Sequence, residues 1–235
     1  MTDTDLRSPS PRLRAFVREA LDRPGIANFV ASAARAMPAG SAVVDAGAGD
    51  APYAELFSHC RYVTVDWDRS VHAGAAESDV LASLDSLPFE ADAFDGALCT
   101  QVLPNVAEPL VVLRELCRVL KPGGVLWLTT SFVWHVHEEP HDYYRFTPFG
   151  LRYLCAEAGL VEVEVRPLGG YFTTMAQLLR NCRALTVRQG EPSRAGLLTR
   201  VGTLWRLRPL LEWLDRYDRR RVLPLGYACT ARKPH

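Results

Sequence analysis

The sequence predicts an α/β fold in which helices cover both faces of a doubly wound, largely parallel sheet. Short apolar runs alternate along the chain with segments whose apolar residues recur at helical spacing. A glycine-rich turn follows the apolar run at residues 42–46, and an aspartate ends the next run at residues 61–66. Strand–helix alternation of this kind favours parallel strands, and ligands of such sheets bind at the carboxyl ends of the strands.

Two helices are expected before the first strand. Residues 1–10 are rich in Ser, Pro, Thr and Asp and are expected to be disordered. Residues 11–22 carry apolar side chains at helical spacing, and a Pro-Gly pair should end that helix. A second helix is predicted for residues 26–37. These features make residues 1–37 an N-terminal helical segment and residues 38–235 the main domain.

Strands and helices then alternate along the main domain. The helix predicted at 147–160 has Thr147 as its N-cap, Pro148 in its first turn and Gly159 near its end. Strict apolar–polar alternation at 161–168 suits a strand near the sheet edge. The expected strands are residues 42–46, 61–66, 94–100, 125–131, 161–168 and 225–233, and the expected helices between them are 51–57, 109–120 and 147–160.

Composition favours a soluble globular protein of the cytoplasm. Hydrophobic residues make up 48% of the 235 residues, and no apolar run is long enough to span a bilayer or to serve as a secretory signal. The six cysteines form no CxxC pair, so they are interpreted as small hydrophobic residues in a reducing compartment. Charge is distributed unevenly: residues 176–222 hold eleven arginines against four acidic residues, a net of +7, although the whole chain has zero net charge.

The stretch VVDAGAGDAPY at residues 43–53 predicts a ligand that approaches the backbone closely. Gly47 and Gly49 give GxG, but Pro52 occupies the position of the third glycine of a dinucleotide fingerprint. Proline there argues against a nicotinamide or flavin pyrophosphate. Asp45 and Asp50 beside the turn suit a cationic ligand without phosphate, although Asp45 could instead brace the turn and Asp50 cap the next helix.

The second strand ends at Asp66 in VTVDWD, where a carboxylate can accept hydrogen bonds from both hydroxyls of a ribose. Together with the glycine turn and the element order, this acid makes the chain resemble the class I S-adenosylmethionine-dependent methyltransferases of the small-molecule type. The stretches LDSLPFEADAFDGALCTQVLPNV and LRELCRVLKPGGVLWLTTS are similar to later parts of that family, and the resemblance covers residues 40–165 and the closing LGYACTARKP.

The resemblance implies a Rossmann-like sheet of seven strands and S-adenosylmethionine as cofactor. It implies that Asp45 lies near the methionine amino group, Asp66 on the ribose and Gln101 facing the methionine part. Ser83 and Leu84 stand where the family holds the adenine edge, with Asp79 as an alternative acid. The cofactor contacts so implied are Asp45, Gly47, Gly49, Asp50, Asp66, Trp67, Ser83, Leu84 and Gln101.

The loop FVWHVHEEPHDYYRFTPFG at residues 132–150 is expected to choose the acceptor. It is similar to a loop of a methyltransferase subgroup found beside glycan and natural-product biosynthesis, where it covers the acceptor pocket. A hydroxyl acceptor needs a base whose pKa lies near 7, so His137 and then His141 are the predicted catalytic residues. No metal is predicted, because HxHxxxH lacks a characteristic ligand spacing. The predicted substrate contacts are Trp134, His135, Tyr143, Tyr144 and Arg145, although Arg145 could instead anchor the loop.

The sequence therefore predicts a methyltransferase that methylates a small molecule, with oxygen as the favoured atom. The alternative is a methyltransferase-like module that binds without turnover. The basic segment 176–222 contains two amphipathic stretches and is interpreted as a helical lid or as a surface that contacts an anionic membrane. No RNA-binding appendage is present in the sequence, so nucleic acid is not an expected partner.

Overall fold

The computed structural model of the chain describes residues 9–68, 70, 72–186 and 208–235. Its centre is a seven-stranded sheet of order β3-β2-β1-β4-β5-β7-β6, in which β7 runs antiparallel to both of its neighbours and the other pairs are parallel. The prediction of a doubly wound, mostly parallel sheet is confirmed. The strands are β1 (Ala42–Ala46), β2 (Arg61–Asp66), β3 (Val80–Leu81), β4 (Phe94–Thr100), β5 (Leu120–Ser131), β6 (Val161–Leu168) and β7 (Gly226–Arg232).

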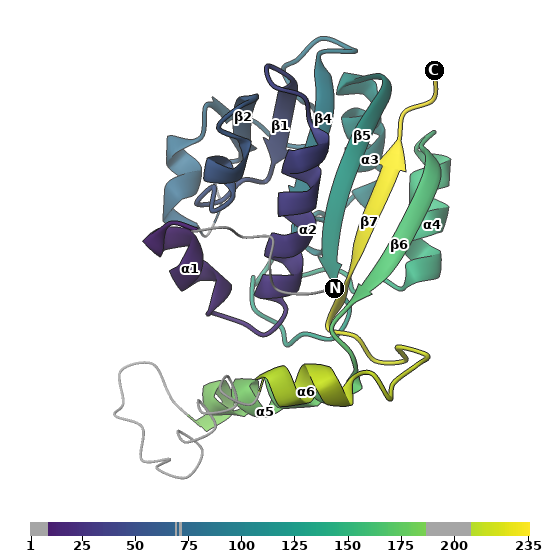
Figure 1. The fold of residues 1–235 in the computed structure, drawn as a ribbon. Helices are drawn as coiled ribbons and strands as arrows, with labels where there is room; N and C mark the ends of the chain where they lie inside the picture. The colour runs from purple at the N-terminus through teal and green to yellow at the C-terminus, as the bar shows by residue number, and fades with distance from the viewer. Residues whose placement is uncertain (1–8, 69, 71, 187–207) are drawn as a thin grey trace.

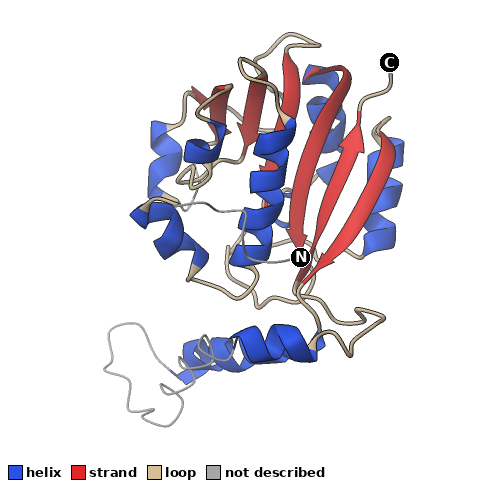
Figure 2. Cartoon of the chain, viewed as in Figure 1, coloured by secondary structure: helices blue, strands red, loops and turns tan. Residues whose placement is uncertain are grey.

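Helices cover both faces of this sheet (Figures 1 and 2). On one face lie α1 (Pro11–Val17) and α2 (Arg23–Ala36), and on the other lie α3 (Pro109–Val119) and α4 (Pro148–Glu157). Alternate residues of β1 show the two cores that result. Val43 packs in the cluster with α2, whereas Val44 packs in the cluster with α3 and α4.

The predicted helix at 147–160 and edge strand at 161–168 are confirmed. Thr147 caps α4 by accepting a hydrogen bond from the Gly150 amide at 3.1 Å, and Pro148 occupies the first turn. The alternating segment forms β6 at the edge of the sheet, where one face is open to solvent. Local sequence rules suffice here because the capping residue and the strand pattern act over a few residues.

Several predicted element boundaries were wrong. The first helix ends at Val17 rather than at residue 22, because the following Pro-Gly pair begins α2 instead of ending α1; proline is tolerated in a first helical turn. Residues 51–57 form only a short 3-10 helix, η1 (Ala54–Phe57), after Ala51 adopts a left-handed backbone conformation. β5 begins at Leu120 rather than at residue 125, and two-residue β3 is too short to leave a periodic pattern.

A helical insert precedes the last strand, as predicted. It contains α5 (Tyr171–Thr186) and α6 (Arg208–Leu214), which pack against each other at the end of the sheet where the parallel strands finish (Figure 1). Residues 187–207, which include much of the second predicted amphipathic stretch, lie outside the described residues. Within the described ranges, no helix is both long and apolar enough to cross a membrane.

The buried carboxylate of Asp215 joins these two helices. From the end of α6 it accepts hydrogen bonds from the backbone amides of Phe172 and Thr173 at 2.8 and 3.4 Å and from the Thr173 hydroxyl at 2.6 Å. Asp215 thereby satisfies free amide groups in the first turn of α5, which a helix cannot pair internally. The carboxylate of Asp215 therefore links the end of α6 to the first turn of α5.

We expect Asp215→Ala to lower the free energy of unfolding by about 2–3 kcal/mol, because the buried amides and the Thr173 hydroxyl lose their acceptor. Urea denaturation measures the change. The matched control is Asp218→Ala, which removes a more exposed carboxylate that accepts a hydrogen bond from the Tyr171 amide at 3.1 Å and should cost less than 1 kcal/mol, on the order of a surface cap. Equal effects of the two substitutions would contradict this account of the insert.

Candidate functional site

A cavity of about 490 Å³ opens at the carboxyl ends of the parallel strands. The ends of four strands reach its wall through Gly47 after β1, Asp66 of β2, Thr100 of β4 and Ser131 of β5. This volume lies in the range of cavities that enclose a cofactor-sized ligand. The position is the one that a doubly wound sheet predicts for its ligand site.

The glycine turn after β1 forms part of the wall. Gly47 and Gly49 have φ values of +80° and +54°, in the left-handed region that favours glycine. A Cβ atom on Gly47 would also lie 2.3 Å from a methyl carbon of Val102, so a side chain has no room there. Pro52 lies on the same wall, and it is followed by the short η1 instead of an α-helix whose N-terminus could hold a pyrophosphate.

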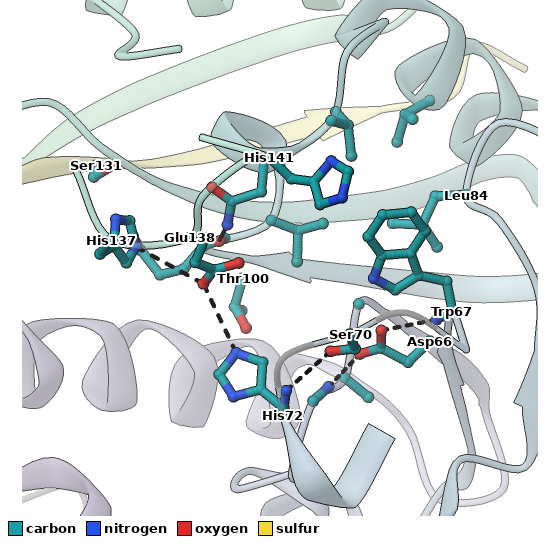
Figure 3. A pocket seen from close by; sticks show the side chains of 18 of the residues that line it. Asp66, Trp67, Ser70, His72, Leu84, Thr100, Ser131, His137, Glu138 and His141 are labelled. Atoms are coloured by element: carbon teal, nitrogen blue, oxygen red, sulfur yellow. Dashed lines mark hydrogen bonds and ion pairs between the residues drawn. The ribbon is translucent and has the colours of Figure 1, made fainter. Parts of the chain in front are cut away.

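Asp66 is buried on the wall with capacity to accept further hydrogen bonds. Its Oδ2 accepts from the Gly49 amide at 2.7 Å and its Oδ1 accepts from the Trp67 amide at 2.8 Å (Figure 3). An ionised carboxylate offers about four acceptor sites, so each oxygen can take one more donor. Ser83 and Leu84 also line the cavity. Asp79 does not, because its carboxylate binds the backbone amide and hydroxyl of Thr64 at 2.8 Å each.

Gln101 lies on the wall just beyond β4 in a left-handed conformation, with φ of +61°. Its backbone amide donates to the Thr129 carbonyl at 2.9 Å, and its side-chain amide donates to the Thr129 hydroxyl at 3.2 Å. A residue other than glycine in this conformation is held there by surrounding contacts, and such residues gather at functional sites. Gln101 is thus fixed at the wall by β5.

Asp45 is predicted as a cofactor contact, but its side chain does not reach the cavity wall. It is buried behind the glycine turn, where Oδ2 accepts a hydrogen bond from the Tyr62 hydroxyl at 2.5 Å and Oδ1 has no partner among the described residues. Burial raises the pKa of Asp45 from 3.8 to about 6; the Tyr62 hydrogen bond opposes this shift and the nearby Asp66 adds to it.

The loop between β5 and α4 covers the cavity and divides the predicted acceptor residues into two groups. Trp134, His137, His141 and Tyr143 line the cavity, whereas His135, Tyr144 and Arg145 do not. His135 Nδ1 accepts a hydrogen bond from the Asn181 side chain of α5 at 2.9 Å, and burial lowers the pKa of His135, helped by the charges of His137 and Arg145. His135 is therefore a neutral contact to the insert.

Tyr144 and Arg145 anchor the loop. The Tyr144 hydroxyl donates to the Ala107 carbonyl at 2.9 Å. Arg145 binds both carboxylate oxygens of Asp142, at 2.5 and 2.9 Å, and donates to the His135 carbonyl at 3.1 Å. The alternative anchoring role of Arg145 thus matches the contacts of its guanidinium group.

His137 is oriented by Asp142. His137 Nδ1 lies 3.3 Å from Asp142 Oδ2, which also accepts from the His137 backbone amide at 3.1 Å. The Arg145 guanidinium holds the pKa of Asp142 well below its usual range, at about 2, so this partner stays ionised. The imidazole is left with Nε2 at the cavity, 3.8 Å from Glu138 Oε1.

Glu138 connects two sides of the cavity. The same Oε1 atom lies 3.8 Å from His72 Nε2, so Glu138 stands between His72 and His137 (Figure 3). The His72 ring packs against Gly49 at the glycine turn. His141 is placed differently, with its ring edge against Trp67 at 5.0 Å and its Nδ1 3.1 Å from the Tyr143 hydroxyl. In the described ranges, no three His, Cys, Asp or Glu side chains are arranged to hold a metal ion.

Several residues on the wall were missed by the sequence reasoning. Asp22 and Arg23 come from the start of α2, and Oδ1 of Asp22 and the hydroxyl of Tyr53 are buried with no hydrogen-bond partner in the described part of the chain. Asp85 follows Ser83 and Leu84 in the sequence and lines the cavity beside them. No spacing rule connects Asp22 to residues 43–53, because only the folded chain brings them together.

The wall is strongly acidic and fits a cationic ligand with an amino acid end. Among the described residues of the wall, Arg23 supplies the one guanidinium group. The buried Asp22 Oδ1 and Tyr53 hydroxyl, which have no hydrogen-bond partner in the described part of the chain, can pair with polar groups of a ligand. An excess of carboxylates attracts a sulfonium ion, and Asp66 can accept from a ribose. The carboxylates on the wall are Asp22, Asp50, Asp66, Asp85, Glu108 and Glu138.

Part of the chain is similar in sequence to known methyltransferases. Residues 44–128 match the family model described as a methyltransferase domain. The ubiquinone/menaquinone biosynthesis C-methyltransferase UbiE of Chromobacterium violaceum is 38% identical over 85 residues, which cover 36% of this chain and 35% of that protein. The chain thus matches about a third of the length of this curated relative.

Solved structures show the same fold at low sequence identity. The [4+2]-cyclase SpnF superposes with a TM-score of 0.58 at 22% identity, covering 91% of this chain and 81% of that one. Phosphoethanolamine N-methyltransferase 2 of Haemonchus contortus, in complex with S-adenosyl-L-methionine, superposes with a TM-score of 0.56 at 17% identity, covering 95% of this chain and 60% of that one.

The sheet order and the glycine turn with Asp66 are those of a Rossmann-like fold, and residues 44–128 within it resemble a methyltransferase domain.

We expect Asp45→Asn to raise the free energy of unfolding of the cofactor-free protein by up to about 3 kcal/mol at pH 7. The reason is that the folded pKa of about 6 lies above the ordinary value of 3.8, so wild-type stability is highest below the unfolded pKa and falls as pH rises through the folded pKa. Asparagine removes the buried charge and can still accept the Tyr62 hydrogen bond. Thermal unfolding between about pH 4.5 and pH 8 should show the gain shrinking toward the acid end, and a gain independent of pH would refute this cause.

We expect Asp66→Ala to weaken S-adenosylmethionine binding by about 1.5–3 kcal/mol, the scale of a lost pair of charge-assisted hydrogen bonds. Calorimetry measures the affinity. The control is Asp79→Ala, which removes a carboxylate of the same β2–β3 region that does not reach the cavity and should leave the affinity unchanged. A folded Asp66→Ala protein with wild-type affinity would show that Asp66 is not the ribose acceptor.

Proposed function

We propose that the protein transfers a methyl group from S-adenosylmethionine to a hydroxyl oxygen of a small, natural-product or glycan-related acceptor. The observation that carries this proposal is the Asp142–His137 pair, in which Asp142 holds Nδ1 and leaves Nε2 at the cavity. A histidine held in this way is suited to act as a general base for a hydroxyl. The acceptor loop supports the glycan and natural-product class only through the resemblance of its sequence.

The cofactor residues of this proposal are those on the wall around the glycine turn. Gly47 and Gly49 let the backbone approach the ligand, Asp66 accepts from the ribose, and Gln101 faces the methionine part. Asp50, Trp67, Ser83 and Leu84 complete the contacts, and Asp45 acts from behind the turn by supporting it. When bound, S-adenosylmethionine supplies an electrophilic methyl group on a sulfonium ion.

The residues of the acceptor loop perform the proton chemistry in this mechanism. His137 Nε2 accepts the hydroxyl proton of the acceptor, and the resulting imidazolium is stabilised by Asp142 at Nδ1 and by Glu138 near Nε2. Arg145 keeps Asp142 ionised and in place. Trp134 and Tyr143 close the cavity, which excludes water and aligns the acceptor. His141, packed against Trp67, is the alternative base.

The proposal is tested first on cofactor choice. Calorimetry with S-adenosylmethionine, S-adenosylhomocysteine and NAD should show binding of the first two alone. A screen of metabolite extracts with methyl-labelled S-adenosylmethionine should then yield a labelled small molecule. Binding of S-adenosylmethionine without any transfer would favour the alternative of a non-catalytic module. A cytoplasmic location and the absence of a nucleic-acid partner stay predictions that fractionation and RNA-binding assays check.

We expect His137→Ala to leave cofactor affinity intact and to lower turnover of the labelled acceptor by about 10²-fold or more. The pH profile should lose its limb near neutrality. Asp142→Asn should also lower turnover, because the imidazolium formed on His137 loses its anionic partner. His235→Ala, at the opposite end of the sheet, is the control and should keep the wild-type profile. Wild-type turnover of His137→Ala at every pH would assign the role to His141 or to no base.

A further inference from the structure

One face of α5 exposes apolar side chains to solvent. Tyr171, Met175 and Leu179 follow each other at intervals of four residues, which places them on one side of the helix, and their exposed fractions are 42%, 40% and 52%. The opposite side packs on the domain. There Gln177 accepts a hydrogen bond from the Leu21 amide at 2.8 Å, and the Thr174 hydroxyl donates to the Leu223 carbonyl at 2.8 Å.

The neighbouring α6 has a similar exposed side. Leu210, Trp213 and Tyr217 are three or four residues apart, and their exposed fractions are 49%, 46% and 69%. The rings of Trp213 and Tyr217 pack edge to face, with centroids 5.4 Å apart. These six residues of α5 and α6 and the following turn are called the outer apolar face here. Apolar side chains gathered in this way mark an interaction site more often than a solvated surface.

Basic residues accompany this face. Arg216, Arg219 and Arg220 are exposed directly after α6. Across residues 176–222 the net charge is +7, and the remainder of the chain is negative by the same amount because the whole chain is neutral. Among the described residues, Arg216, Arg219 and Arg220 therefore give this end of the molecule positive charge that an anionic surface attracts.

We propose that the outer apolar face binds the surface of an anionic lipid bilayer, with α5 and α6 lying in the plane of the headgroups. Exposed apolar and aromatic side chains beside arginines are the features of helices that lie at such an interface, and Trp and Tyr are enriched there. A second copy of this chain is a poor occupant, because a symmetric contact would bring the exposed Arg216, Arg219 and Arg220 of both copies together. The basic and the apolar side chains thus favour an anionic lipid bilayer over a second copy of the chain.

Binding through the outer apolar face also determines how the domain is oriented on the bilayer. α5 and α6 lie at the end of the sheet where the parallel strands finish and the cavity opens (Figure 1). α5 also reaches the loop over the cavity through the Asn181–His135 hydrogen bond. A protein bound through the outer apolar face is oriented with its cavity end toward the lipid. Membrane binding does not depend on the proposed methyl transfer and is tested without it.

The test is sedimentation of the full chain with vesicles of phosphatidylcholine alone and of phosphatidylcholine mixed with phosphatidylserine. We expect binding to the mixed vesicles at low salt, weaker binding at high salt because charge attraction is screened, and none to phosphatidylcholine alone. Trp213→Ala combined with Leu179→Ala should lower the partition coefficient by about tenfold or more. Arg216→Glu should lower it by about tenfold.

Matched controls test whether the effect belongs to this face. Phe149→Ala with Tyr153→Ala removes two exposed aromatic side chains from α4, and Arg114→Glu reverses an exposed charge on α3. Both control proteins should bind as wild type does. All of the substituted side chains are exposed or half exposed, and thermal unfolding checks that each variant is folded.

Three outcomes would overturn the proposal. The first is no binding of the wild-type chain to mixed vesicles at low salt. The second is binding that the α5–α6 variants leave unchanged or that the α4 and α3 controls reduce equally. The third is a dimer, seen by light scattering, that Trp213→Ala dissociates, which would assign the face to a second copy.

Discussion

The turn between β1 and η1 is the constraint on which the site depends. The backbone amides of Gly47 and Ala48 donate to the Val65 carbonyl at 2.8 and 3.1 Å, and the Gly49 amide donates to Asp66 at 2.7 Å. Val102 after β4 fills the space beside Gly47 that a side chain would need. These contacts therefore hold the ends of β1, β2 and β4 together. The cavity-lining residues at these strand ends are positioned by the same junction.

The acceptor side is built by a second set of contacts that is independent of the turn. The amides of Tyr143 and Tyr144 donate to the Pro104 carbonyl, and Arg145 clamps Asp142. These contacts hold the loop over the cavity by its C-terminal half, while Glu138 approaches His72 on the cofactor side. The proposed acceptor side and the proposed cofactor side are thus held mainly by separate contacts, as expected where function lives in loops on a rigid sheet.

The parts of this arrangement that depend on near neighbours in sequence could be predicted, and the parts that depend on distant contacts could not. Most of the strands, the α4 cap and the position of Asp66 follow from periodicity and from residues within one turn, whereas the two-residue β3 does not. Asp22 reaches the cavity only because α2 packs across the sheet, and Glu138 meets His72 from a loop 66 residues away in the chain. Asp45 shows the same limit: its motif marks it as important, yet its side chain lies behind the wall.

Two features of the molecule oppose its stability, and both bear on function. The Asp45 carboxyl is buried with one oxygen unpartnered among the described residues, and the outer apolar face of α5 and α6 leaves aromatic side chains in water. A sequence selected for stability alone would place an uncharged residue at position 45 and polar residues on the outer apolar face. Asp45 lies beneath the turn that meets the ligand, and the outer face lies at the cavity end. Both destabilising features therefore lie where a bound ligand or a surface can offset their cost in folding free energy.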